Sequence, residues 1–310
     1  MKKEDLLDQH NHVLALNNIN LDIKSKHIHV IMGLSGSGKS TLIRHVNRLI
    51  EPTSGKIIVD GKNMLEMSDD ELREFRRFKA SMVFQKFALL PHRSVIKNVA
   101  YGLLIQGVNK VEAYERSQKW IDKVSLNGYE NSYPYQLSGG MQQRVGLARA
   151  MATDAGILLM DEAFSSLDPL IRKSMQEILL DLQKELNKTI IFITHDLDEA
   201  LRIGDQISIL RDGAIIQTGS PEDILLEPKD KYISNFTKDI NRGRILKVSS
   251  IMKKKITIKA TKILHNIFIE DAIPIIAKSS EGEAAVVNNN GNIIGTVSLD
   301  SAISAISSKE

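Results

Sequence analysis

Four short apolar runs, separated by helix-like segments, dominate the hydrophobic pattern up to about residue 200. The runs are Val30–Met32, Ser81–Phe84, Ile157–Met160 and Ile190–Thr194, and the residues that follow them are Gly33, Gln85, Asp161 and His195. Continuous Val, Ile and Leu runs of this length are typical of strands buried on both faces of a parallel sheet. Ligands of open α/β sheets bind beyond the carboxyl ends of such strands. The pattern therefore predicts an α/β fold with its site at that edge.

Helical periodicity fills the intervals between these runs. An amphipathic helix is predicted by the spacing of Ile171, Met175, Ile178, Leu179, Leu182 and Leu186. A helix-like run, Thr41–Ile50, follows the first strand. Ile57–Asp60, followed by Gly61, predicts a strand and turn in an antiparallel portion. Pro91–Gln136 lacks strand-like runs, and we expect a helical subdomain over about residues 91–155.

Near Asn241–Arg244 the pattern changes to shorter periods, which divides the chain into a domain over 1–240 and a small α+β domain over 245–310. The second domain is predicted to contain strands at Ile256–Ala260, Ala284–Asn288 and Ile293–Val297, the last two joined by a turn with Asn290 and Gly291. A helix is predicted over Asp271–Ser279, with Asp271 as its cap and Pro274 in its first turn.

The composition is that of an ordinary soluble globular protein, with 42% hydrophobic and 25% charged residues among 310. The absence of cysteine excludes disulfides, thiolate metal sites and a cysteine nucleophile. A net charge of +3 is too small to indicate nucleic-acid binding. No apolar run approaches the roughly 18 residues of a membrane span, and the charged segment Met1–Asp8 does not resemble a secretory signal. We expect a cytosolic protein whose membrane role would come through a partner chain or surface contact.

The sequence GLSGSGKS, between the first strand and a helix-like run, has the context of a phosphate-binding P-loop. Its glycines let backbone N–H groups turn inward around phosphates, and the helix N-terminus adds a favourable dipole. Lys39 would reach the β- and γ-phosphates of ATP, and Ser40 would bind Mg²⁺. The residues expected to contact the nucleotide here are Gly33, Ser35, Gly36, Ser37, Gly38, Lys39, Ser40 and Thr41.

Two acids end the third apolar run. Asp161 would hold the Mg²⁺, directly or through water, and Glu162 would orient and deprotonate the attacking water. Adjacent acids are commonly a solvated strand end. Their position after ILLM, downstream of a P-loop, favours the catalytic interpretation.

LSGGMQQ, at Leu137–Gln143, is the motif that discriminates between classes of ATPase. Ser138, Gly139 and Gly140 open a predicted helix, so they offer backbone amides to a phosphate a second time, with Met141 and Gln142 beside them. One nucleotide needs only one P-loop. A second phosphate-binding helix start therefore indicates two half-sites that meet across a homodimer.

Taken together, residues 13–240 resemble the ATP-binding-cassette (ABC) family. LSGGMQQ resembles its signature motif, Gln85 its Q-loop, Ser166-Leu167-Asp168 its D-loop and His195 its switch histidine. The resemblance implies a RecA-like parallel-sheet core, an antiparallel β portion and a helical subdomain. It implies that His195 contacts the γ-phosphate, that Gln85 links Mg²⁺ occupancy to the transporter interface, and that Asp168 belongs to the nucleotide site. Glu162, His195 and Gln85 would then be catalytic, and Ser40, Gln85 and Asp161 would hold the metal.

Other P-loop classes fit the sequence less well. Asn187-Lys188 begins like a GTPase base-recognition motif, but Ile190 stands where the required Asp would be. Chromosome-maintenance ATPases insert long coiled coils between the P-loop and the signature, whereas Lys39 and Ser138 are only 99 positions apart. Double-cassette translation and repair factors carry two P-loops, and this sequence contains one.

Longer stretches resemble one branch of the ABC family, the ATPase subunits of glycine betaine/proline importers. They are IMGLSGSGKST, VNRLIEPTSGKI, MVFQKFALLPH, LSGGMQQRVGLARAM, LLMDEAFSSLDPLIR and THDLDEALRIGD. The resemblance implies a peripheral ATPase on the cytoplasmic face of the inner (plasma) membrane. Its partners would be transmembrane permease subunits and, through them, a periplasmic or extracellular substrate-binding protein. An importer for another small polar solute, such as an amino acid, and a non-transport regulatory ABC ATPase are the alternatives.

The second domain resembles a single CBS-type regulatory module, with GTVSLD at Gly295–Asp300 as its characteristic turn. Asp300 follows Ser298 by two residues, where nucleotide-binding modules usually have three. We therefore favour pairing between two chains over adenosine binding by one module, with a simple packing appendage as the alternative. The cluster Lys253–Lys255 is either a solvated surface or a sensor of anionic lipid or ionic strength.

The N-terminal segment departs from the ABC pattern. ABC proteins usually stack adenine on an aromatic residue ahead of the P-loop, but Met1–Met32 contains no Phe, Trp or Tyr. His10 or His12 would offer a weaker planar surface, or both are simply solvated. We expect weaker discrimination between bases than is usual in the family.

Overall fold

The computed structural model describes residues 11–165, 167–254, 261–279 and 281–307. The chain folds as two compact units. The first comprises the chain up to Asp196 together with Ile203–Ile216, and the second comprises Leu197–Arg202 together with Gln217–Glu310. The expected first domain, 1–240, includes segment 217–240, which the structure places in the second unit. The expected domains 1–240 and 245–310 stay a prediction. Among the described residues, no helix is both long and apolar enough to cross a membrane.

A six-stranded sheet in the order β4-β5-β6-β1-β7-β8 carries the predicted site. Its strands are β1 (Ile28–Met32), β4 (Ala80–Val83), β5 (Ile157–Asp161), β6 (Thr189–Thr194), β7 (Gln206–Arg211) and β8 (Ala214–Gly219). The four strands expected from the apolar runs are confirmed, and they pair in parallel. Met32 lies opposite Thr194, and Asp161 lies opposite Ile193. The register therefore brings the residues that follow these strands to one edge, as expected.

Helices pack on this sheet through apolar faces. α2 (Lys39–Val46) follows β1, and α8 (Pro169–Leu186) has the amphipathic spacing predicted for it. Ile43 of α2 packs in one cluster with Ile31 and Leu159 of the strands. The helix expected to reach Ile50 ends at Val46, because Asn47 caps it and Arg48 has a left-handed backbone with φ of 50°.

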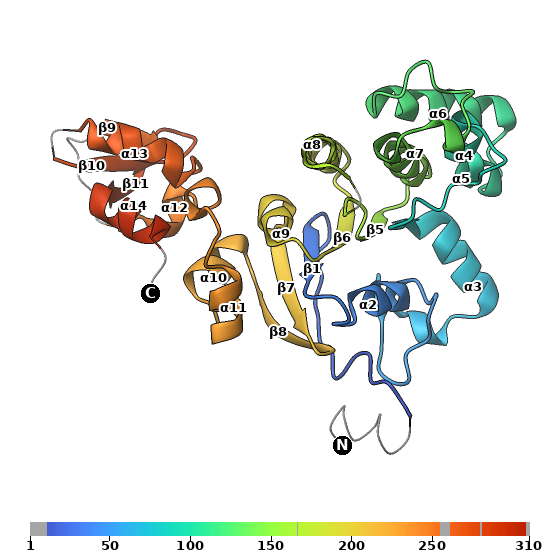
Figure 1. Cartoon of the computed structure of the whole chain (residues 1–310), viewed down its shortest axis with the longest axis horizontal. Helices are drawn as coiled ribbons and strands as arrows, with labels where there is room; N and C mark the ends of the chain where they lie inside the picture. The colour runs from blue at the N-terminus through green and yellow to red at the C-terminus, as the bar shows by residue number, and fades with distance from the viewer. Residues whose placement is uncertain (1–10, 166, 255–260, 280, 308–310) are drawn as a thin grey trace. The chain divides into compact units, whose positions relative to one another are not determined.

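The segment expected to be helical forms a cluster of helices with a core of its own (Figure 1). Its elements are α4 (Val95–Val99), α5 (Tyr101–Ile105), α6 (Lys110–Lys123), the 3-10 turn η3 (Pro134–Gln136) and α7 (Gly139–Ala152). Val99, Leu103, Ile121 and Val145 are fully buried against one another in this cluster. α7 begins where LSGG predicted a helix start, so the helical subdomain presents the signature motif at the amino end of α7.

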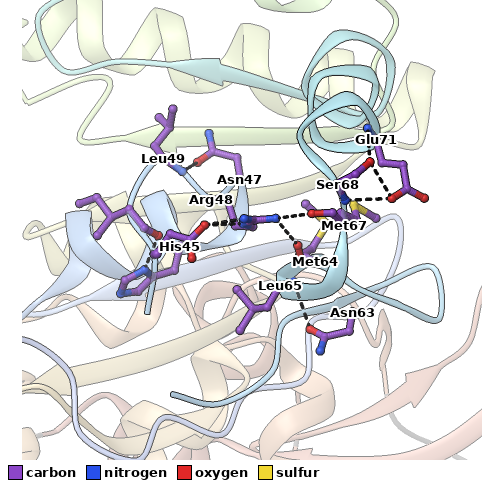
Figure 2. A network of polar contacts seen from close by, with 12 residues as sticks. His45, Asn47, Arg48, Leu49, Asn63, Met64, Leu65, Met67, Ser68 and Glu71 are labelled. Atoms are coloured by element: carbon purple, nitrogen blue, oxygen red, sulfur yellow. Dashed lines mark hydrogen bonds and ion pairs between the residues drawn. The ribbon is translucent and has the colours of Figure 1, made fainter. Parts of the chain in front are cut away.

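The antiparallel portion is smaller than predicted, and an arginine holds it to the end of α2. It contains β2 (Ile58–Val59), β3 (Lys62–Asn63), the 3-10 turn η1 (Met64–Glu66), α3 (Asp69–Glu74) and a π-helical turn η2 (Phe75–Lys79). The Arg48 guanidinium donates to the carbonyls of Met64 at 3.0 Å and Met67 at 2.9 Å (Figure 2). Charge-assisted bonds of this kind are stronger than neutral ones, so they fix this portion beside the P-loop helix.

The second unit contains a three-stranded sheet in the order β11-β10-β9 (Figure 1). Its elements are α10 (Pro221–Leu226), α11 (Lys231–Phe236), η4 (Arg242–Arg244), α12 (Val248–Ile251), β9 (Thr261–Leu264), α13 (Ile269–Ala277), β10 (Glu283–Val287), β11 (Ile293–Ser298) and α14 (Leu299–Ile306); α9 (Leu197–Ile203) begins within it. The two strands expected around Asn290 and Gly291 are confirmed as an antiparallel pair. The expected strand Ile256–Ala260 lies outside the described residues.

The prediction for α13 was wrong in its start. Phe268 is the N-cap, so Asp271 lies inside the first turn and Pro274 lies in the helix interior. Burial decides the start, because Ile269, Ala272 and Ile276 share the buried face. Asp271 still stabilises the helix by placing a negative charge near the positive end of its dipole.

A buried histidine in the central strand predicts a pH-dependent stability. His29 is 1% exposed, with Nε2 2.8 Å from Ser208 Oγ, and burial lowers its pKa from 6.5 to about 4. The unfolded chain therefore binds this proton at a higher pH than the folded chain does. The free energy of unfolding should fall by about 3 kcal/mol as the pH is lowered from about 6.5 to about 4. Urea unfolding across this range measures the loss, and an unchanged loss in His29→Gln would contradict its assignment to His29.

Candidate nucleotide site

The loop between β1 and α2 is shaped to wrap around an anion. Gly36 and Gly38 have φ of 78° and 101°, a left-handed conformation that favours glycine. A Cβ on Gly38 would lie 2.6 Å from the Ala15 carbonyl oxygen, so the position also needs glycine for space. The Ser37 carbonyl accepts a bond from Gly213 N at 3.1 Å, which ties the loop to the turn after β7. The backbone therefore forms the predicted P-loop at the amino end of α2.

Lys39 is folded into this loop. Its ammonium donates to the carbonyls of Gly33 at 2.9 Å and Leu34 at 3.0 Å, and it lies 3.6 Å from Glu162 Oε1. Burial lowers the pKa of Lys39, while Glu162 and Asp161 act in the opposite direction. The loop thus holds a desolvated positive charge, which strengthens its attraction for phosphate.

Asp161 pairs with two side chains of α2. Its Oδ1 accepts a 2.7 Å bond from the Ser40 hydroxyl, and its Oδ2 lies 3.2 Å from Arg44 Nη2. The expected meeting of Ser40 and Asp161 is present. Arg44 was missed by the sequence analysis, although its position four residues after Ser40 places both on one helix face.

Glu162 is the point where three predicted residues converge. Gln85 Nε2 donates to its Oε2 at 3.1 Å, His195 Nδ1 lies 3.4 Å from the same oxygen, and Lys39 faces Oε1. The main chain of Glu162 is left-handed, with φ of 45°, and its N–H donates to the Ile193 carbonyl at 3.1 Å. The residues at the ends of three strands, Gln85, Glu162 and His195, therefore meet around one carboxylate.

A cavity of about 360 Å³ opens beside these residues. Its lining consists of Val13, Ala15, Ser35, Gly36, Gly38, Lys39, Ser40, Thr41, Gln85 and Glu162. Six of the eight predicted P-loop residues, all except Gly33 and Ser37, thus share one cavity with two of the predicted catalytic residues, Gln85 and Glu162. Val13 and Ala15, which the sequence analysis had not assigned, form its aliphatic wall.

The signature residues and Asp168 do not line this cavity. Ser138 caps α7 by accepting a bond from Met141 N at 3.3 Å, with Gly139, Gly140 and Gln142 in the turn that follows. Asp168 caps α8 by accepting bonds from Leu170 N at 3.2 Å and Ile171 N at 3.1 Å. The predicted helix start at the signature is confirmed, and its role toward a second nucleotide stays a prediction. Ser166 lies outside the described residues.

The residues present fit a nucleoside triphosphate and a magnesium ion. Ser37 Oγ is buried within the loop and has no hydrogen-bond partner among the described residues. Lys39 and the N-terminus of α2 supply positive charge for phosphate. Ser40 and Asp161 place a hydroxyl and a carboxylate side by side, and oxygen ligands of this kind suit Mg²⁺.

This fold and site define a P-loop nucleoside triphosphatase. A model of the ABC transporter family matches residues 16–165. Among curated proteins, the glycine betaine transport ATP-binding protein OpuAA of Bacillus subtilis is 54% identical over 84% of this chain, which spans 62% of that protein's length. The glycine betaine/carnitine transport ATP-binding protein GbuA of Listeria monocytogenes is 50% identical, over 95% of this chain and 73% of its own length. The chain belongs to the ABC transporter family.

Solved structures agree with this assignment. The dimeric ABC transporter cassette MJ0796 is 36% identical, with a TM-score of 0.63 over 67% of this chain and 90% of that one. A structure of the same cassette in a post-hydrolysis state, bound to ADP and phosphate, matches equally well. The predicted ABC cassette fold is therefore confirmed.

The aliphatic wall of the cavity predicts weak discrimination between bases. Val13 is 74% exposed, and none of the described lining residues is aromatic. Apolar contact with a valine does not distinguish adenine from guanine, so the ATP-to-GTP affinity ratio should stay below about tenfold, or 1.4 kcal/mol. Val13→Tyr should add stacking and tighten ATP binding, whereas Val13→Ala should change it little. Titration with fluorescent ATP and GTP analogues measures both, and a ratio well above tenfold in the unmodified chain would contradict the prediction.

Proposed function

We propose that this chain is the ATP-hydrolysing subunit of an ABC importer for glycine betaine or a related quaternary amine. The observation that carries the ATPase assignment is the convergence of Lys39, Gln85 and His195 on Glu162 beside a P-loop cavity. The cargo is supported by relatives, including a glycine betaine/proline betaine transport ATP-binding protein, ProV of Escherichia coli, that is 42% identical across 100% of this chain.

In the proposed mechanism, the P-loop amides and Lys39 bind the phosphates of ATP. Ser40, Asp161 and Gln85 would hold Mg²⁺, which supplies positive charge to the phosphate oxygens as negative charge moves between them. Glu162 orients a water molecule and accepts its proton, and His195 donates a hydrogen bond toward the terminal phosphate. The short distances from Gln85 and His195 to the Glu162 carboxylate support these roles.

Two copies of the chain would share two ATP molecules, each between the Lys39 loop of one copy and the Ser138 helix start of the other. This proposal is supported by the position of Ser138, Gly139, Gly140 and Asp168 outside the cavity of their own chain. Closure of the homodimer would drive a transmembrane permease from the cytoplasmic face of the membrane. A periplasmic or extracellular binding protein would deliver the solute to that permease.

Reconstitution of the complex tests the cargo. The chain should co-purify with a membrane permease, and glycine betaine should stimulate its ATPase activity more than methionine, choline or trimethylamine N-oxide. Each of these solutes appears in the name of a relative, such as the methionine import protein MetN of Staphylococcus haemolyticus, which is 45% identical over 73% of this chain. If methionine alone stimulated the ATPase activity, the proposed solute would be methionine and not glycine betaine. ATPase activity without any permease would favour a regulatory ATPase.

Residues 245–310, which form the last part of the second unit, are proposed to be a single CBS-like regulatory module. A sheet in the order β11-β10-β9, with α13 and α14 packed beside it, supports this assignment. The expected GTVSLD turn falls at the junction of β11 and α14, where Ser298 caps α14. Calorimetric titration of the full chain with AMP and with ATP tests for a nucleotide site beyond that of the cassette. A second binding event would contradict the expectation that one module does not bind adenosine by itself.

A further inference from the structure

The backbone directly after Gln85 is strained. Phe87 and Ala88 have φ of 58° and 48°, which puts two consecutive non-glycine residues in the left-handed region. Side chains at such positions crowd the following carbonyl, so the conformation persists only where surrounding contacts enforce it. Two backbone hydrogen bonds close the turn. Phe87 N donates to the Phe84 carbonyl at 3.1 Å, and Ala88 N donates to the Lys86 carbonyl at 2.5 Å. We name residues 85–88 the Gln85 turn.

One side chain of α7 donates hydrogen bonds to the carbonyls of both strained residues. Arg149 Nη1 donates to the Ala88 carbonyl at 2.7 Å, and Nη2 donates to the Phe87 carbonyl at 3.1 Å. The planar guanidinium presents two donors in a fixed fork, which a lysine ammonium does not reproduce. Gly146, one turn earlier on α7, lies against the same turn, since a Cβ there would be 3.7 Å from the Phe87 carbonyl oxygen. α7, the helix that begins at the signature motif, therefore contacts the Gln85 turn directly.

The chain just after the Gln85 turn is held at Leu90 by a different side chain, Asn98. Asn98 is fully buried, accepts a bond from Leu90 N at 2.8 Å and donates to the Leu90 carbonyl at 3.1 Å. The near end continues from β4, which is paired with β5. The Gln85 turn therefore lies between β4 and Leu90, which are each held by other contacts. Between these two points, the Arg149 guanidinium binds the turn.

We propose that Arg149 is a positioning residue that holds the strained Gln85 turn, sets Gln85 against Glu162 and so connects the catalytic carboxylate to the signature helix. The inference rests on the proposed ATPase function for its catalytic consequence. Arg149 itself touches no reacting group. Its effect passes through the Phe87 and Ala88 carbonyls to Gln85, whose amide lies 3.1 Å from the Glu162 carboxylate.

The variant Arg149→Lys tests this role in the full chain. Hydrogen exchange of the peptide spanning residues 84–90 should become at least about tenfold faster. Lysine cannot make both hydrogen bonds of the Arg149 guanidinium to the turn, whereas the β4 pairing and the Asn98 bonds are kept. In the reconstituted complex, kcat should fall about tenfold, equivalent to about 1.4 kcal/mol, while KM for ATP changes less than about twofold. The matched control is Arg144→Lys, which also lies on α7 but donates to the Val124 carbonyl, away from Gln85. It should leave both readouts unchanged.

A second variant tests the strain itself. Glycine adopts the left-handed region freely, so adding Ala88→Gly to Arg149→Lys should restore kcat to within about threefold of the unmodified protein. Unchanged exchange in Arg149→Lys, an equal effect of Arg144→Lys, or no recovery with Ala88→Gly would overturn the proposal. Hydrogen exchange needs no hydrolysis. An altered turn in a chain with no ATPase activity would therefore refute the proposed function while leaving the contact with the signature helix in place.

Discussion

Replacing Glu162 with glutamine is expected to slow ATP hydrolysis by about 10²- to 10⁴-fold while ATP stays bound, because glutamine fills the same space but accepts no proton. Glu162 is the carboxylate on which Lys39, Gln85 and His195 converge. The contacts that bind phosphate come from the P-loop and do not need this proton acceptor. Single-turnover hydrolysis and retention of radiolabelled ATP on a gel-filtration column measure the two effects separately.

The same variant should convert the chain into a stable ATP-bound dimer. If each ATP lies between the Lys39 loop of one copy and the Ser138 helix start of the other, blocked hydrolysis removes the step that separates the copies. Light scattering with and without ATP gives the mass. Glu185→Gln is the matched control, because Glu185 lies on α8 and pairs with Lys123, away from the cavity. A monomer in the presence of ATP and permease would contradict the shared site.

Replacing Lys39 with methionine is expected to weaken ATP binding by about 100-fold, or about 2.7 kcal/mol. Methionine keeps most of the side-chain volume but removes the ammonium that the loop holds at 2.9 Å from the Gly33 carbonyl. Methionine also leaves the Gly33 and Leu34 carbonyls without their donor, so the ATP-free variant should unfold at a lower temperature. Fluorescence titration with ATP should show the loss of affinity.

A second buried lysine supplies the control for Lys39. Lys188 is 5% exposed and donates to Asp154 at 3.0 Å and to the Ala155 carbonyl at 2.7 Å, outside the cavity. Lys188→Met should lower the unfolding temperature because it leaves that buried carbonyl without its donor, yet it should leave ATP affinity unchanged. Equal losses of affinity in both variants would show that the effect at position 39 comes from folding and not from phosphate binding.

Local pattern was enough to predict the ends of the four parallel strands to within a residue and the helix start at the signature motif. β1 and β6 are almost completely buried, and continuous apolar composition of this kind indicates a central parallel strand. β4 lies at the edge of the sheet and is only partly buried, which its composition did not reveal. Ser138 and Asp168 are capping residues whose hydrogen bonds reach only two or three positions along the chain. Arg44 was predictable in the same way, because helix geometry puts it on the face of Ser40.

The prediction was less accurate where burial competes with local preference. Asp271 is a good capping residue, but Phe268 begins α13 because that start buries Ile269, Ala272 and Ile276 together. Likewise α2 ends at Val46, since Arg48 turns back to bond the carbonyls of Met64 and Met67. In both cases a contact with distant residues outweighs the propensity of the helix itself.

The sequence by itself determined the phosphate-binding loop, because residue types at fixed local spacing dictate its backbone geometry. Its resemblance to the ABC family is confirmed by the comparisons. Only the tertiary structure decided which groups act on one another. The meeting of Gln85, Glu162 and His195 depends on the strand register, and the grip of Arg149 on a turn some 60 positions earlier depends on how α7 packs. Such contacts join residues far apart in the chain, and their geometry comes from packing and not from local spacing.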